Sequence, residues 1–464
     1  ENALEQASFS VSKVKTKMVP RQPAPPFITS SLQQEAWRRL RFSAKQTMAI
    51  AQQLYEGLPI GKEGSVGLIT YMRTDSTRVA RSAIVEAREF ISKKYGAEFV
   101  PPHARSFARV VKGAQEAHEA IRPTRILREP SQIKQYLNNN QFRLYELIWK
   151  RMVASQMAAA LLDSTTIDIE ARCPDSKDVY LFRTSSSVLR FAGFTTLYTE
   201  QKDEAEEEKL SSLPSLEKGD DLRLLGLFPD RHFTQPPPRF TEATLIKMLE
   251  QWGIGRPSTY APTLSTIQDR EYVAKTNGSL HPTDLGFVVN DLVGKYFPDI
   301  VDLKFTARME DELDEIADEK RDWVGVVQGF YTSFEKSLNE ASSLIKKVKL
   351  PDEVTDEVCP EGHPMVVKVG RFGKFLACSQ YPEHKYTKSY QIKTGAKCPQ
   401  CGGELLQRVS KKKRTFYGCS NYPDCKFVIN AKPLLQSCPK CGSLLTEYRG
   451  TQTKCTKCHY KGKL

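Results

Sequence analysis

The chain has 464 residues, 27% of them charged, and a formal net charge of +13. No apolar run approaches the roughly 20 residues that cross a bilayer, which argues against a helical membrane protein, and the length predicts about two to four domains. Residues 351–464 hold 20 basic and 9 acidic side chains, a net charge of +11. A basic tail can simply be a solvated surface, but such a concentration favours a polyanionic partner.

Hydrophobic periodicity predicts strands on both sides of a helical block, followed by more helices. The first predicted strand is 9–14, and the proline-rich stretch 20–26 is expected to be extended. The elements that follow in chain order are helices at 31–40, 44–55 (capped by Ser43), 82–95 and 140–162, strands at 165–170, 179–182 and 221–226, a helix at 241–252, and mixed helix to about 347.

Ten of the eleven cysteines lie in the basic tail, where units of about 40 residues begin at Cys359, Cys398 and Cys438. Paired spacing predicts metal binding in a reducing compartment rather than disulfides. Two units have four-thiolate zinc spacing: Cys398, Cys401, Cys419 and Cys425, then Cys438, Cys441, Cys455 and Cys458. The first unit offers Cys359, His363, Cys378 and His384 instead, so two or three zinc sites are expected.

Residues 67–78 hold a tyrosine in an unusual chemical setting. Tyr71 is flanked by Arg73, Arg78 and several short hydroxyl or carboxyl side chains. A phenol with a pKa of about 10 is a poor nucleophile unless cations or oriented donors stabilise its anion and an anionic electrophile. The segment therefore indicates attack on a phosphodiester, although a structural tyrosine is the ordinary alternative.

An acidic cluster occupies 310–315, interleaved with Met309, Leu313 and Ile316. This spacing favours an amphipathic helix with a solvated acidic face over a metal site.

The motifs at 25–36, 69–77, 117–124, 253–261, 267–270 and 305–314 occur in one order, and together they resemble the bacterial type IA DNA topoisomerases. The resemblance implies a multidomain α+β fold, a toroid followed by three zinc-ribbon-like repeats. The expected domains are a β-rich gate domain (1–30 and 159–230), an inserted helical domain with the nucleophile (31–158), a second helical domain (231–350), and ribbons at 351–393, 394–433 and 434–464.

In such an enzyme Tyr71 would attack DNA and retain the 5′-phosphate, with Arg73 stabilising charge. His118 would touch the scissile phosphate or orient groups that do. Arg122 would either contact DNA or pair with Glu119. The other implied DNA contacts are Arg78, Arg256, Ser258 and Thr259, together with Phe416 and Tyr417, whose rings could instead pack the ribbon core.

The implied function is ATP-independent relaxation of negatively supercoiled DNA, and no Gly-x4-Gly-Lys-Ser/Thr loop occurs. No match to the acidic Mg²⁺-binding set of the family's toprim domain occurs either, so we expect a fragment that binds DNA but cleaves poorly alone. The alternatives are a non-catalytic single-stranded DNA-binding protein and a topoisomerase III-like decatenase. A monomer in the cytoplasm at the nucleoid is expected, with underwound DNA as partner and RNA polymerase as a candidate contact of the tail.

Overall fold

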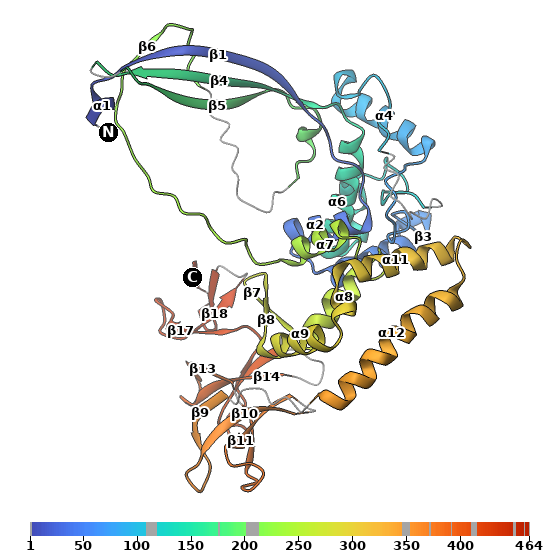
Figure 1. Ribbon diagram of the computed structural model, residues 1–464, viewed down its shortest axis with the longest axis vertical. Helices are drawn as coiled ribbons and strands as arrows, with labels where there is room; N and C mark the ends of the chain where they lie inside the picture. Colours follow the sequence, from blue (N-terminus) through green and yellow to red (C-terminus); the bar gives the residue numbers. More distant parts are fainter. Residues whose placement is uncertain are drawn as a thin grey trace. The chain divides into compact units, whose positions relative to one another are not determined.

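The computed structural model of the chain describes residues 2–107, 118–174, 177–200, 213–345, 353–370, 373–390, 392–409, 415–448, 452–458 and 460–463. The chain divides into two compact units, residues 1–347 and 348–464, which are coloured blue to orange and orange to red in Figure 1. Within the described ranges, no helix combines the length and apolar character needed to cross a membrane.

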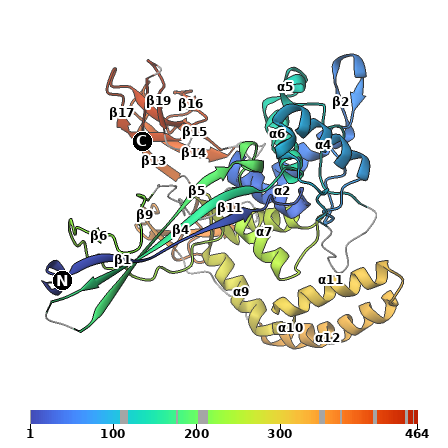
Figure 2. The same ribbon diagram turned by 90° about the horizontal axis from the view of Figure 1, so that it is seen from above.

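A four-stranded antiparallel sheet joins the beginning of the first unit to its middle. Its strands, in the order β5-β4-β1-β6, are β5 (Val179–Phe191), β4 (Ala160–Arg172), β1 (Ser8–Arg21) and β6 (Asp221–Leu222). The three long strands run side by side in Figures 1 and 2. The register runs from Ser8 opposite Arg172 to Arg21 opposite Ala160. The strands predicted at 9–14, 165–170 and 179–182 are therefore confirmed but too short, whereas 221–226 was predicted too long.

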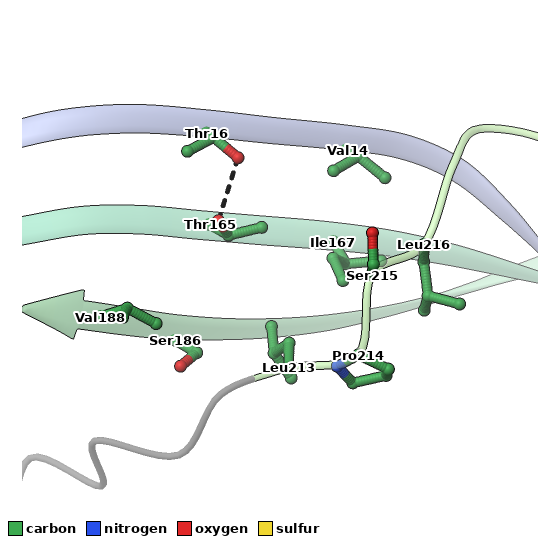
Figure 3. A pocket seen from close by; sticks show the side chains of 10 residues that line it. All are labelled: Val14, Thr16, Thr165, Ile167, Ser186, Val188, Leu213, Pro214, Ser215 and Leu216. Atoms are coloured by element: carbon green, nitrogen blue, oxygen red, sulfur yellow. Dashed lines mark hydrogen bonds between the residues drawn. The ribbon is translucent and has the colours of Figure 1, made fainter. Parts of the chain in front are cut away.

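One face of this sheet is partly covered by residues 213–216, which cross it beside a cavity of about 200 Å³ (Figure 3). The hydroxyls of Thr16 and Thr165 hydrogen bond to each other there at 3.0 Å. The strand residues lining the cavity are spaced two apart, as the alternation of a β-strand requires: Val14, Thr16, Thr165, Ile167, Ser186 and Val188.

Helices follow the first strand and enclose the main hydrophobic core. They are α2 (Thr29–Glu35), the π-helical η1 (Ala36–Leu40), α3 (Ala44–Glu56), α4 (Arg81–Tyr95), α5 (Pro130–Ile133) and α6 (Asn139–Ser155). Short elements lie between and around them: α1 (Asn2–Glu5), β2 (Leu58–Pro59), η2 (Gly61–Glu63), β3 (Ser65–Val66), η3 (Ala97–Phe99), η4 (Lys134–Tyr136) and η5 (Gly193–Thr196). The predicted Ser43 cap is confirmed, because its side chain accepts a hydrogen bond from the Gln46 amide at 3.1 Å.

The helix predicted at 140–162 is wrong at its end. It stops at Ser155, and Ala160 already opens β4. Residues 157–162 are rich in alanine and leucine, which favour a helix, but Leu161 pairs with Pro20 across the sheet. Tertiary pairing thus overrides local propensity.

A second helical region completes the first unit. It contains α7 (Glu242–Gln251), α8 (Tyr260–Asp269), the hairpin of β7 (Val273–Thr276) and β8 (Ser279–Pro282), α9 (Asp284–Tyr296), α10 (Pro298–Val301), α11 (Leu303–Ala317) and α12 (Trp323–Leu344). Ile246, Leu264 and Leu280 form one core cluster with Ala44 of α3. The buried Glu242 carboxylate also accepts a hydrogen bond from the Ala44 amide at 2.9 Å, so α7 caps α3. This contact holds the two helical regions together.

The second unit repeats one small antiparallel sheet three times in its described part. The first repeat has β9 (Glu353–Val358), β10 (Pro364–Gly370), β11 (Gly373–Cys378) and β12 (Thr387–Ser389). The second has β13 (Ile392–Lys397), β14 (Glu404–Val409), β15 (Thr415–Cys419) and β16 (Val428–Ile429). The third has β17 (Pro433–Ser437), β18 (Leu444–Tyr448), β19 (Gln452–Cys455) and β20 (Lys461–Lys463). Each core contains only a few apolar residues beside buried cysteines.

Candidate functional site

The loop that carries Tyr71 is fixed by threonines on both sides. Thr29, at the start of α2, donates its hydroxyl to the Met72 carbonyl at 2.8 Å and accepts the Thr74 amide at 2.9 Å. Thr70 donates its hydroxyl to the Ala120 carbonyl at 2.7 Å and accepts the Arg122 amide at 3.0 Å. Two motifs that are distant in sequence, 25–36 and 117–124, therefore position the 69–77 motif.

Burial alternates along this loop. Met72, Thr74 and Ser76 are each less than 8% exposed, whereas the odd-numbered residues between them are half-buried or exposed. Tyr71 and Arg73 therefore belong to the less buried side of the loop.

The Tyr71 ring lies between two other aromatic rings. Its centroid is 5.4 Å from Tyr55 in an edge arrangement and 5.0 Å from the His118 imidazole. Tyr71 packs against the edge of the main core and remains half-buried. The structure thus brings the predicted tyrosine and histidine together. Tyr55 had not been recognised from the sequence.

The arginines of this region differ in their surroundings. Arg73 and Arg78 are exposed. Arg122 is half-buried; its Nε donates to Glu119 at 2.7 Å and its Nη1 to the Pro123 carbonyl at 3.0 Å. Of the two predictions for Arg122, the pairing with Glu119 is the contact present here.

The glycine-rich loop between α7 and α8 approaches its neighbours closely. Gly253 and Gly255 have φ angles of 70° and 83°, which a side chain rarely tolerates. A Cβ at Gly255 would also lie 3.1 Å from the Thr259 hydroxyl. Thr259 accepts the Arg256 amide at 2.8 Å, and both Ser258 and Thr259 are exposed.

Arg256 does not project freely from this loop. Its Nη2 and Nε donate to Asp314 of α11 at 2.8 and 3.2 Å, and Glu310 and Asp311 lie within 4.0 Å of the guanidinium. The helix predicted for the acidic cluster is confirmed. The solvated face is confirmed in part, because Asp311 and Glu315 are exposed, whereas Asp314 is half-buried and pairs with Arg256.

Asp75 links the Tyr71 loop to this arginine electrostatically. Burial raises the pKa of the Asp75 carboxyl above its ordinary value, and Asp314 adds to the rise, whereas Arg256 and His118 oppose it. Asp75, Arg256 and Asp314 are therefore near enough to influence one another electrostatically.

The tail contains three tetrads with metal-ligand geometry among its described residues, and each tetrad has its ligand atoms within 4.8 Å of one another. Two ligands on a tetrahedral zinc with bonds of about 2.3 Å lie about 3.8 Å apart. Among the closest Sγ–Sγ pairs, the distance is 3.3 Å for Cys401 and Cys419 and 3.7 Å for Cys398 and Cys425. All of these cysteines are free thiols, so zinc fits and disulfides do not. The twelve predicted ligands fall together as expected.

The first tetrad is the mixed one, and its histidines are oriented for metal binding. The Nδ1 atoms of His363 and His384 lie 3.6 and 3.5 Å from the Cys359 sulfur. The Nε2 atom of His384 is 3.2 Å from the Glu361 carboxylate. A carboxylate on one ring nitrogen fixes the proton there and leaves the other lone pair for the metal. Glu361 is a supporting residue that spacing alone did not reveal.

The aromatic residues of the ribbons separate into buried and exposed sets. Tyr417 is only 7% exposed and Phe416 is half-buried, whereas Tyr381 and Tyr422 are 44% and 60% exposed. Lys368 lies over the Tyr381 ring at 5.4 Å, and Arg408 lies over Tyr422 at 5.8 Å, in matching places of two repeats. The basic residues at 411–414 lie outside the described residues.

Comparisons with known proteins identify the family of the chain. A family model described as DNA topoisomerase matches residues 1–328, and one described as topoisomerase DNA binding C4 zinc finger matches 356–393 and 395–434. The chain is also similar to a structure of full-length topoisomerase I from Thermotoga maritima, with 36% identity and a TM-score of 0.62. That match covers 83% of this chain and 60% of the other. The predicted type IA fold with zinc-ribbon repeats is confirmed, and the chain belongs to the bacterial type IA DNA topoisomerase family.

Proposed function

We propose that Tyr71 is the nucleophile of a DNA strand-cleavage reaction. Its phenolic oxygen forms a bond to a backbone phosphorus, its proton is released, and the bond from phosphorus to the 3′-oxygen breaks. The leaving 3′-oxygen takes up a proton, and the DNA 5′ end stays on Tyr71 as a phosphodiester. Because one phosphodiester bond is exchanged for another, the reverse reaction can reseal the strand without ATP. The observation that carries this proposal is the half-buried Tyr71 ring beside His118 on a doubly fixed loop.

His118 and Arg73 are proposed to act around this tyrosine. The His118 imidazole is close enough to contact a phosphate bound at Tyr71 or to hold another of its ligands. Arg73 is exposed two residues away, so its guanidinium can bind a phosphate oxygen through two N–H groups. A Mg²⁺ requirement stays a prediction from the family resemblance; the described tetrads have ligands suited to zinc, and no residue is assigned to magnesium.

The strand is proposed to follow the surface formed by the two motif loops. Ser258 and Thr259 are exposed hydroxyls at the start of α8, with Arg256 beside them. Arg78 and Arg122 lie on the Tyr71 side. Arg122 and Arg256 are each paired with a carboxylate, so each would contact DNA only after a phosphate displaces that carboxylate.

The zinc ribbons are proposed to bind single-stranded DNA by base stacking. An exposed aromatic ring gains about 1–3 kcal/mol per stacked base. Tyr381 and Tyr422 carry this proposal best, because each has an exposed ring with a cation over it. Phe416 remains a candidate, whereas the burial of Tyr417 favours a role in its ribbon core.

For the whole enzyme we propose relaxation of negatively supercoiled DNA through strand passage, with a topoisomerase III-like decatenase as the alternative. We further propose a monomer that acts at the nucleoid in the cytoplasm, organised in the domains 1–30 with 159–230, 31–158, 231–350 and the three ribbons. Light scattering of the purified chain tests the monomer. Capture of purified RNA polymerase on the immobilised full chain tests whether RNA polymerase is a partner.

The test of Tyr71 is a covalent-adduct assay. A 3′-end-labelled oligonucleotide is incubated with the chain, a toprim domain from a type IA enzyme and Mg²⁺, and resolved on a denaturing gel. Label should migrate with the protein and should disappear in Tyr71→Phe. Tyr55→Phe is the matched control, because it removes the same hydroxyl from the neighbouring ring and should keep the adduct. An unchanged adduct in Tyr71→Phe would rule out the assignment. Single-strand binding without any adduct would favour a non-catalytic DNA-binding protein.

A further inference from the structure

Arg256 has its hydrogen-bond donors engaged by its own chain. Nε and one N–H of Nη2 point to Asp314, and Nη1 donates to the carbonyls of Gly253 and Gly255 at 3.2 and 3.0 Å. Nη2 also lies 3.5 Å from Asp311. Four of the five N–H groups of the guanidinium are thus hydrogen-bonded, so a DNA phosphate can take the Nε and Nη2 positions only by displacing Asp314.

The charges around Arg256 are mostly negative. Glu310, Asp311 and Asp314 face it from α11, and Asp75 lies within electrostatic reach on the Tyr71 loop. One positive charge is thus surrounded by several carboxylates. Such a surface repels a phosphodiester as long as the carboxylates keep their positions.

We propose that Asp314 is a built-in competitor of DNA at Arg256, so that strand binding here is an exchange in which a phosphate oxygen replaces the Asp314 carboxylate on Nε and Nη2. This inference rests on the proposed function, which supplies DNA as the polyanion, and adds a role for a residue that contacts no DNA itself. Carboxylate and phosphate oxygens accept the same forked pair of N–H groups from an arginine, so one can take the place of the other.

The surroundings allow the exchange without unfolding. The carbonyls of Gly253 and Gly255 hold Nη1, so the guanidinium keeps its place when Asp314 leaves. The Asp314 side chain is 31% exposed, so its carboxylate can turn into water. If the ion pair with Asp314 were purely structural, Arg256 would lose its position when Asp314 left.

The two roles predict opposite effects for Asp314→Asn. A competitor, once neutralised, lets DNA bind about three- to tenfold more tightly. A merely structural partner would leave the affinity equal or lower. The chain's four tryptophans, Trp37, Trp149, Trp252 and Trp323, all precede residue 348. Their fluorescence in the full chain therefore reports binding of an unlabelled oligothymidylate of about twelve nucleotides to the first unit and not to the tail.

Two controls separate competition from a general change in charge. Glu312→Gln removes one negative charge from the same helix, but Glu312 pairs with Arg321 at 3.1 Å, so this variant should bind like the wild type. In an Arg256→Gln background, Asp314→Asn should no longer tighten binding, because the shared partner is gone. Asp314→Ala should act in the same direction as Asp314→Asn.

Equal or weaker binding by Asp314→Asn, or the same tightening in the Arg256→Gln background, would overturn the competitor role while leaving the proposed function intact. If the wild-type chain gave no fluorescence response to the oligonucleotide, both the DNA contact in the proposed function and this inference would fail.

Discussion

Replacing Glu242 by alanine should loosen the junction between the two helical regions of the first unit. The Glu242 side chain is only 3% exposed, and its two oxygens have different partners. One accepts the Ala44 amide at the start of α3, and the other accepts Lys275 at 2.8 Å. Lys275 in turn lies 3.7 Å from the centre of the Trp37 ring. Alanine removes both contacts and leaves a buried amide without its acceptor.

The expected cost follows from these two contacts. A hydrogen bond from a buried amide to a carboxylate contributes about 1.5–3 kcal/mol. The pair with Lys275 adds no more than about 1 kcal/mol, because the lysine is 29% exposed and water screens it. Glu242→Ala should therefore destabilise the junction by about 2–4 kcal/mol. Glu242→Gln keeps an acceptor for Ala44 and should cost about 1 kcal/mol.

Hydrogen exchange is the suitable assay, since a chain of two units need not unfold in one step. Amide protection in 44–56 should fall in Glu242→Ala, with a smaller change in 139–155. Lys247→Ala, on the exposed side of α7, is the control and should change protection by less than about 0.5 kcal/mol. If alanine and glutamine at 242 gave the same result, the carboxylate would not be acting as the cap of α3.

Three further results are expected. Removing zinc with a chelator should abolish the strand signal of the tail in circular dichroism and leave the helical signal of the first unit, because the ribbon cores are too small to fold alone. Tyr422→Ala should weaken single-strand binding about fivefold or more without changing the melting of its ribbon, whereas Tyr417→Ala should lower that melting temperature. Burial raises the folded-state pKa of Asp75, so ionisation of its carboxyl lowers the stability of the first unit as the pH rises above about 4. Asp75→Asn should therefore stabilise the first unit at pH 7, and thermal melts should show that this gain vanishes below about pH 4.

Local signals in the sequence predicted those features that depend on nearby residues. Ser43 caps α3 because its hydroxyl reaches the amide three residues ahead, which is a short-range rule. The zinc tetrads were predictable for the same reason, since each knuckle sets its own spacing.

Features that depend on distant pairing were not predictable from periodicity. Leu161 and Leu162 belong to a strand because β1, about 140 residues earlier, and β5 both pair with them. Tyr71 meets His118 because Thr70 bonds to 120–122, a contact that no local pattern encodes. The capture of Arg256 by Asp314 joins residues 58 positions apart. The family resemblance suggested that these motifs act together, but it did not provide their contacts.

The electrostatic attraction of DNA and the proposed cleavage at Tyr71 belong to different parts of this chain, and they should respond differently to salt. The tail carries +11 of the net +13, which leaves the first 350 residues almost neutral. In that first unit, Arg122 and Arg256 are already paired with carboxylates. Long-range attraction of DNA should therefore come from the tail and weaken steeply with salt, because neutralised phosphates release counterions. At Arg122 and Arg256 a DNA phosphate replaces a paired carboxylate and releases few counterions, so the exposed Arg73 and Arg78 are the contacts near Tyr71 that add to the salt dependence.

Raising the salt concentration from 50 to 200 mM should accordingly lower total DNA binding about tenfold or more. The fraction of bound DNA that becomes covalently attached to Tyr71 should change by less than about twofold, because the exchange at Arg256 leaves the local charge balance nearly constant. Filter binding and the denaturing-gel adduct, measured on the same samples, give the two quantities. A covalent fraction that fell in parallel with binding would mean that the first unit also draws DNA by net charge, and the separation would be wrong.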